Sequence, residues 1–353
     1  MAFWTCVIAL FVASVPNQVP GELVSLPFSR GDNIFTSRKS PSGGVDFCIQ
    51  DGPEGMPRIL IPATEAPLDA EVPLPDFCLS DDGRYVAYFV TQPEKRYEAI
   101  RIIETQTGRR LGDEIKWTHF GDFAWRGNGF YYGAYREPAT SDAKYSDERL
   151  LYHRLGEPQD KDTIVYEDKD HPKRKYQFLT TFDHRFFLLH LLERVDGKAL
   201  AAEWFRREGD LQGKFTPLIA ELAPGRTYLC DNVGDHLFLY TQYKSPAGRI
   251  IDVDTKHPEE KNWNTVLPEP VDDGEPVLGK LAILAKQPGG GNQARVYTMQ
   301  GKLEKVIPTE PGTTADIQFC RAHEEYVFVS VEKDKSKSYF IWDYKSNRLI
   351  PFR

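Results

Sequence analysis

Residue types that could carry catalysis are present in this chain, but not in the spacings that catalysis requires. A serine hydrolase of the α/β class exposes its nucleophile in a G-x-S-x-G turn, and no serine has that context. The eight histidines form no H-E-x-x-H motif, with which a zinc peptidase places two imidazoles on one helix face. We therefore predict no catalytic residue and no metal site in this chain.

Two further motifs resemble binding loops but lack essential members. Gly289-Gly290-Gly291 is not followed by the Lys-Ser/Thr of a phosphate-binding loop, so we predict a hairpin there. Asp252 and Asp254 would lie on one face of a strand, but the glycine and distal glutamate of a calcium loop are missing. The five cysteines show no C-x-x-C spacing, which indicates free thiols. No cofactor is predicted.

Composition narrows the class of partner. The chain has 353 residues with a formal net charge of −8, and it contains no block of lysine and arginine. A nucleic-acid-binding protein needs a basic surface to neutralise phosphates, so we expect no nucleic acid partner. A hydrophobic content of 41% is enough to build a buried core from a chain of this length.

A repeated unit organises the chain. Its clearest copy is the polar turn LSDDGR at residues 79–84, followed by the apolar run YVAYFV at residues 85–90. Aspartate and glycine favour a tight turn, and the aromatic and β-branched residues after it favour a strand. Equivalent strand residues in seven copies are Ile34, Tyr85, Phe130, Phe186, Leu237, Leu281 and Tyr326. Each copy precedes a third strand, a turn and a short fourth strand.

Four strands in a unit of about 49 residues are typical of a β-propeller blade. We therefore predict an all-β protein, a seven-bladed β-propeller of four-stranded antiparallel blades over residues 22–353. A pair of sandwich domains would show strands at shorter intervals without this longer period. Large aromatic side chains are expected to fill the spaces between blades. The tryptophans predicted to do so are Trp117, Trp125, Trp204, Trp263 and Trp342.

The first 21 residues form an apolar segment outside the repeats. Residues 12–14 (VAS) resemble a signal-peptide cleavage site, but no lysine or arginine precedes Arg30. The segment is either a signal peptide, a mis-assigned start or a stretch packed on the ring. We expect a cytoplasmic protein, with export as the alternative if residues 1–14 are cleaved. The apolar run is too short to span a bilayer, so no membrane partner is predicted.

Several segments are more specific than a generic propeller. The clearest is LYHRLGEPQDKD at residues 151–162, followed by VYE at residues 165–167. It closely resembles a segment of the prolyl oligopeptidase family of serine peptidases. Further similar segments, in the family's order, are residues 27–32 (PFSRGD), 80–88 (SDDGRYVAY), 117–125 (WTHFGDFAW) and 257–263 (HPEEKNW). The resemblance covers residues 22–352, nearly the whole chain.

The resemblance implies a propeller that caps an α/β-hydrolase domain and limits access to short peptides cut after proline. The catalytic serine, aspartate and histidine of the family would lie beyond the matching region. Phe120 matches the propeller phenylalanine that lines the family's substrate pocket, so we predict that Phe120 binds substrate. The segment HPKRK at residues 171–175 departs from the family, which usually has an aromatic residue after Pro-Lys, followed by apolar pocket residues.

Three interpretations remain open on the sequence alone. The chain is a non-catalytic gating propeller, either severed from its hydrolase half or supplied to an α/β-hydrolase domain in trans. Alternatively, it is a stand-alone scaffold that binds peptides or proteins. The third interpretation is a truncated gene model of a complete proline-specific serine peptidase. A G-x-S-x-G motif encoded downstream of Arg353 would favour the third.

Overall fold

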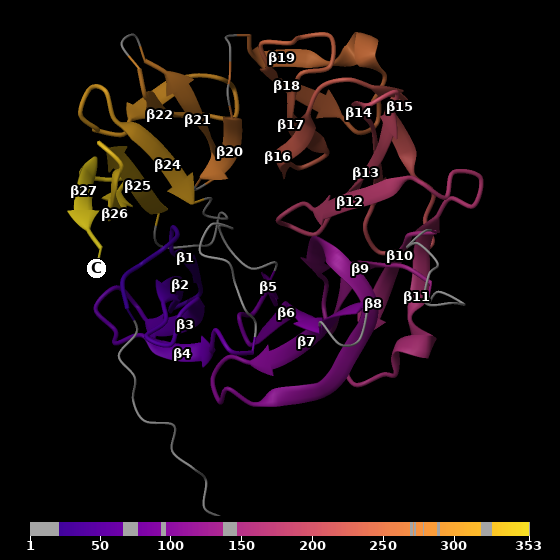
Figure 1. The fold of residues 1–353 in the computed structure, drawn as a ribbon. Helices are drawn as coiled ribbons and strands as arrows, with labels where there is room; N and C mark the ends of the chain where they lie inside the picture. The colour runs from indigo at the N-terminus through magenta and orange to yellow at the C-terminus, as the bar shows by residue number, and fades with distance from the viewer. Residues whose placement is uncertain are drawn as a thin grey trace, which may run out of the picture.

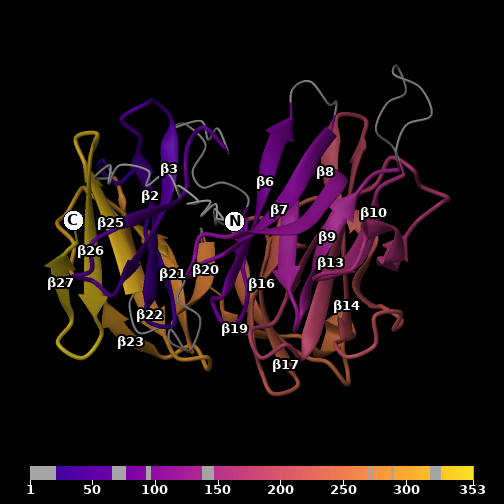
Figure 2. The same cartoon turned by 90° about the horizontal axis from the view of Figure 1, so that it is seen from below.

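The computed structural model describes residues 21–65, 77–92, 97–136, 147–268, 271, 273–277, 279–287, 290–318 and 327–352. Within strands, the side chains of residues 91–92, 119–122, 273–277, 286 and 318 are not described. Antiparallel sheets follow one another around a ring (Figure 1), and Figure 2 shows this ring from the side. The described part of the chain contains no α-helix, and hence no helix that could cross a membrane. The predicted N-terminal segment falls almost entirely outside the described residues.

Five sheets have four strands each, consecutive in sequence. The first comprises β1 (Phe28–Arg30), β2 (Asn33–Lys39), β3 (Val45–Asp51) and β4 (Arg58–Ile61). Another comprises β12 (Lys175–Thr180), β13 (Phe186–Val195), β14 (Lys198–Arg207) and β15 (Thr216–Ala223). The next comprises β16 (Thr227–Val233), β17 (His236–Thr241), β18 (Arg249–Asp254) and β19 (Asn264–Leu267). The fourth comprises β20 (Asp273–Val277), β21 (Lys280–Lys286), β22 (Asn292–Tyr297) and β23 (Leu303–Val306). The fifth comprises β24 (Thr314–Gln318), β25 (Val327–Lys333), β26 (Ser336–Asp343) and β27 (Arg348–Pro351).

The remaining strands form one seven-stranded sheet between the first and second of these sheets along the chain. Its strands are β5 (Phe77–Leu79), β6 (Tyr85–Gln92), β7 (Tyr97–Glu104), β8 (Arg110–Trp125), β9 (Gly129–Ala134), β10 (Arg149–Arg154) and β11 (Thr163–Glu167). Two short 3₁₀ helices, η2 (Gln159–Lys161) and η3 (Glu260–Asn262), lie in loops.

The prediction of seven four-stranded blades is therefore wrong, because the described residues form five such blades and the seven-stranded sheet. The cause lies in β8, which pairs with β7 on one side and β9 on the other and so joins the two expected units. Elsewhere, each link between consecutive sheets contains proline, which interrupts ladder pairing. Residues 110–125 contain none, so this strand continues through the place where a break was expected.

Bends in β8 allow one strand to serve both halves of the sheet. Its pairing shifts register against β7 and again against β9, between Thr118 and Phe123. Trp117 has a φ of 61°, in the left-handed region that L-residues seldom adopt. Extra residues in one strand of a pair bend and twist that strand. The two halves can therefore face different neighbours while remaining hydrogen-bonded.

Strand alternation places most of the core between neighbouring sheets. On β13, Phe187, Leu189 and Leu191 pack against the seven-stranded sheet, whereas Phe186 and Leu188 pack against the sheet of β16 to β19. Successive side chains of a strand point to opposite faces, so an apolar run is buried on both sides. Trp342 is buried, and Trp204 and Trp263 are partly buried, in such layers. Trp125 is buried among residues of the seven-stranded sheet itself. Trp117 packs on Tyr97 of its own sheet.

The ring closes where the last sheet meets the first (Figure 1). Leu26 and Ile34 pack there against Phe328 and Phe352, and the two phenylalanine rings lie 5.2 Å apart. Among the described residues, no strand of the first sheet is hydrogen-bonded to the last sheet. Closure therefore depends on apolar side chains, and we call this contact the seam.

Candidate functional site

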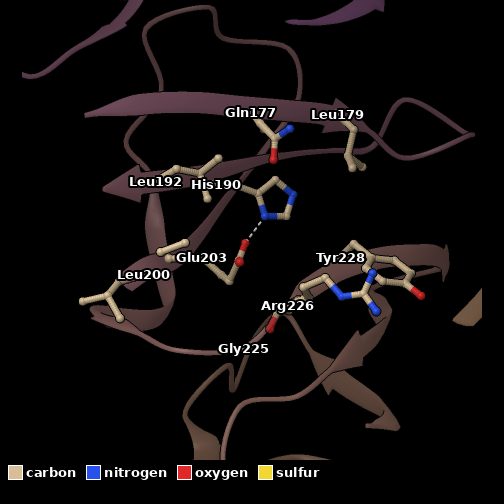
Figure 3. Close-up of a pocket in the computed structure, with 12 residues that line it drawn as sticks. Gln177, Leu179, His190, Leu192, Leu200, Glu203, Gly225, Arg226 and Tyr228 are labelled. Atoms are coloured by element: carbon tan, nitrogen blue, oxygen red, sulfur yellow. Dashed lines mark ion pairs between the residues drawn. The ribbon is translucent and has the colours of Figure 1, made fainter. Parts of the chain in front are cut away.

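A cavity of about 400 Å³ lies between the sheet of β12 to β15 and strand β16 (Figure 3). Its walls come from β12, β13, β14 and the loop that leads into β16. This volume is within the range of small-molecule sites. Most of the lining is apolar, with Leu179, Leu192 and Leu200 around a few polar side chains.

The cavity continues the apolar layer between these two sheets. Alternation along β13 carries Phe186 and Leu188 into that layer, and His190 and Leu192 follow on the same face. Phe186 and Leu188 are closely packed, whereas His190 and Leu192 face open space. The cavity thus begins where the apolar side chains of the face give way to a histidine.

His190 and Glu203 form a buried ion pair at the floor of the cavity (Figure 3). They are directly opposite each other on β13 and β14, and both are more than nine-tenths buried. His190 Nδ1 contacts Glu203 Oε2, which fixes the plane of the imidazole ring. Burial raises the pKa of the Glu203 carboxyl, while the charge and hydrogen bond of His190 act in the opposite direction. Such a pair is costly to bury, so its place at a cavity is a pointer to function.

Arg226 and Tyr228 line the other wall of the cavity, from the loop before β16 and its start. Arg226 is exposed and extends beside the Tyr228 ring (Figure 3). The backbone N–H of Arg226 donates to the Gln242 side chain at 3.1 Å, which holds this loop in place. Among the described residues, no hydrogen bond or ion pair involves the guanidinium of Arg226.

The chemistry of this lining supports binding rather than bond cleavage. A histidine oriented by a carboxylate can activate a serine or cysteine nucleophile, but the lining includes neither residue type. The hydroxyl of Thr227 is already hydrogen-bonded to Thr241, 2.7 Å away. The described residues hold no cluster of three metal-ligating side chains.

Phe120, the predicted substrate contact, lies on β8, but its side chain is outside the described residues, so its role stays a prediction. The segment that departs from the family pattern is described. Arg174 pairs with Asp168 at 2.9 Å and with Glu193 at 3.1 Å, and the Lys175 ammonium lies over the Tyr135 ring. These basic side chains thus have local partners.

Neither His190 nor Glu203 was predicted as a site residue from the sequence. A signal was present, because His190 interrupts the apolar run FFLLHLL and Glu203 interrupts ALAAEWF. A titratable residue in a strand that is buried on both faces must have a partner or line a cavity. Their pairing itself depends on the register of β13 and β14, which these two runs do not specify.

A second buried titratable group, His153, joins three segments of the seven-stranded sheet. Its Nδ1 lies 2.8 Å from Asp162, which follows η2, and its Nε2 lies 3.4 Å from Asp113 on β8. The Tyr132 hydroxyl donates to the same Asp162 at 2.6 Å. Burial lowers the pKa of His153, but the hydrogen bonds and charges of the two aspartates outweigh burial, so the pKa is raised.

This cluster predicts a pH dependence of stability. The stabilisation from protonated His153 is complete below the unfolded pKa of about 6.5 and is lost as pH rises through the higher folded value. The urea midpoint should therefore fall between pH 6 and pH 9, and His153→Gln should reduce that fall. Urea titrations of both proteins at the two pH values measure the difference. If the urea midpoint falls by the same amount between pH 6 and pH 9 in both proteins, the pH dependence belongs to groups other than His153.

Comparison with known proteins gives a consistent result. A family model described as the N-terminal β-propeller domain of prolyl oligopeptidase matches residues 17–346. The prolyl endopeptidase of Elizabethkingia meningoseptica is 21% identical over 291 residues, which are 81% of this chain and 41% of that protein. Prolyl oligopeptidase A of Galerina marginata is 24% identical over 308 residues, which are 77% of this chain and 38% of that protein.

Solved structures show the same fold. Prolyl oligopeptidase B from Galerina marginata, bound to a 25mer macrocyclization substrate, superposes with a TM-score of 0.81 at 17% identity. The superposition covers 96% of this chain and 51% of that one. The chain therefore spans about half the length of this structure and about two-fifths of the curated relatives.

Proposed function

The chain belongs to the prolyl oligopeptidase family, as its N-terminal β-propeller domain, and from this premise we propose that it admits short peptides to an α/β-hydrolase domain. That domain lies either in a partner chain or in the remainder of a longer protein. The observation that carries the proposal is the extent of the match, which runs from residue 17 to residue 346 and covers all the strands of the ring except β27.

Peptides are the ligand class that this family membership favours. One relative with the same fold is described as bound to a macrocyclization substrate of 25 residues. We propose that the ring would select such ligands by size, since an extended chain is narrower than a folded protein. Phe120 would add apolar contact area for the residues that precede proline.

A chimera tests this function. Residues 22–352 would replace the propeller of the Elizabethkingia meningoseptica enzyme, and turnover of a short proline-containing peptide would be measured against that of a folded protein. We expect cleavage of the peptide alone. The isolated chain should neither cleave the peptide nor react with a serine-directed phosphonate, because no serine of its sequence lies in a G-x-S-x-G turn. A chimera that melts cooperatively but leaves the peptide intact would contradict the proposal.

Phe120→Ala in the same chimera tests the predicted contact. The value of KM should rise several-fold while kcat changes little, because the side chain would bind substrate without touching the reacting atoms. Leu303→Ala removes an exposed apolar side chain from a distant sheet and provides the matched control. A fall in kcat with constant KM would contradict the assigned role.

The stand-alone scaffold remains a second candidate, favoured by one observation. The cavity with His190, Glu203 and Arg226 is formed wholly by this chain. A ligand could therefore bind there without a hydrolase domain.

A further inference from the structure

We propose that the cavity between β12–β15 and β16 binds the carboxyl-terminal end of a short apolar peptide. In this arrangement Arg226 contacts the free carboxylate, and the last side chain of the peptide enters the cavity. The choice of a peptide rests on the proposed function, whereas the choice of a carboxylate rests on the lining alone.

The walls select for an apolar side chain. Leu179, Leu192 and Leu200 surround the space, and the Tyr228 ring adds a flat, half-buried surface (Figure 3). Filling a cavity of about 400 Å³ removes apolar area from water on both partners. An aromatic or large aliphatic residue therefore fits better than a small or charged one.

The charges select for an anion at the mouth. Glu203 is the one carboxylate of the lining, and its charge is opposed by His190 within the floor. Arg226 is the cation that remains, and its guanidinium is exposed beside the cavity. A guanidinium presents paired N–H donors that match the two oxygens of a carboxylate. A cationic ligand would meet Arg226 before it reached the buried Glu203.

The floor adds a polar position at a defined depth. His190 and Glu203 are held against each other by the contact between His190 Nδ1 and Glu203 Oε2 (Figure 3). This fixed pair limits how deeply an apolar side chain of the peptide can enter the cavity. Ligand pockets commonly combine an apolar wall with a few such fixed polar groups.

Isothermal titration calorimetry on the whole chain tests the proposal. The probes are N-acetyl-Ala-Phe with a free carboxylate and the same peptide as its C-terminal amide. We expect the free acid to bind about tenfold more tightly, as one charge-assisted contact provides. Arg226→Gln should reduce the affinity for the acid to that for the amide and leave the amide unchanged. Arg348→Gln changes an exposed arginine on β27 and should have no effect on either.

A second variant tests the cavity itself. Ala199 is exposed at its rim, so Ala199→Phe should fill the entrance without disturbing the core and abolish binding of both peptides. Absence of binding by the free acid at millimolar concentration, equal affinity for acid and amide, or a preference that survives Arg226→Gln would each overturn the proposal. Because the titration uses no hydrolase domain, its outcome is independent of the chimera experiment.

Discussion

Trp125→Ala is expected to lower the free energy of unfolding by about 3–5 kcal/mol, the usual cost of removing a large buried aromatic side chain. Trp125 ends β8 and is 4% exposed. Its ring centroid lies 5.3 Å from that of Phe130 and 6.4 Å from that of Tyr85, so it joins β9 to β6 across the seven-stranded sheet.

Phe120→Ala provides the comparison for this experiment. Truncation of a side chain that lines a substrate pocket should lower the free energy of unfolding of the isolated chain by about 1 kcal/mol or less. Denaturant midpoints of the wild type and the two variants, measured in parallel, give both values. A midpoint for Phe120→Ala as low as that for Trp125→Ala would place Phe120 in the core and remove its predicted role.

A loss of similar size, about 3–5 kcal/mol, is expected for Glu208→Ala, because it breaks a buried ion pair. The Glu208 side chain is 2% exposed. It accepts hydrogen bonds from the Tyr131 hydroxyl at 2.8 Å and from Arg126 Nε at 3.3 Å, and buried Arg206 lies 4.0 Å away. These contacts join the seven-stranded sheet to the sheet of β12 to β15. Without the carboxylate, the positive charge of Arg206 would remain buried with little compensation.

A glutamate in an exposed ion pair provides the control for Glu208→Ala, because its removal shows the effect of losing a surface carboxylate alone. Glu310 lies 2.6 Å from Lys333, and both side chains are well exposed. Water screens such pairs, so Glu310→Ala should leave the denaturant midpoint unchanged. Thermal or urea melts of the two variants would show the difference. Similar losses in both would mean that Glu208 contributes no more than a surface charge.

The repeat and the two-residue alternation were sufficient to predict an all-β propeller. Turn residues such as Asp82 and Gly83 mark the hairpins correctly, and β6 begins at Tyr85, where the sequence places a strand. The number of blades was predicted wrongly, because it depends on whether a strand stops between Leu111 and Phe123. The lack of proline in residues 110–125 allows the strand to continue, but the register shifts and the backbone bend that let it serve both halves are specified by no residue type in the segment.

The cavity was harder to predict than the fold. Burial of His190 follows from the apolar run around it, but the open space beside it depends on the loop that carries Arg226 to the facing wall. That loop belongs to a different repeat, so the two walls meet only in the folded ring. Chemistry shared between repeats is invisible to motifs that are sought within one stretch of sequence.

The seam has a consequence for the protein during its synthesis. Each sheet consists of strands that are consecutive in the chain, so it can complete its hydrogen bonds as it leaves the ribosome. The apolar packing of Leu26 and Ile34 is not complete at that stage, because their partner Phe328 is made about 300 residues later. At typical elongation rates this interval is roughly 15–60 s. Throughout that time the nascent first sheet presents an uncovered apolar face, so this sheet is where a chaperone would be needed most.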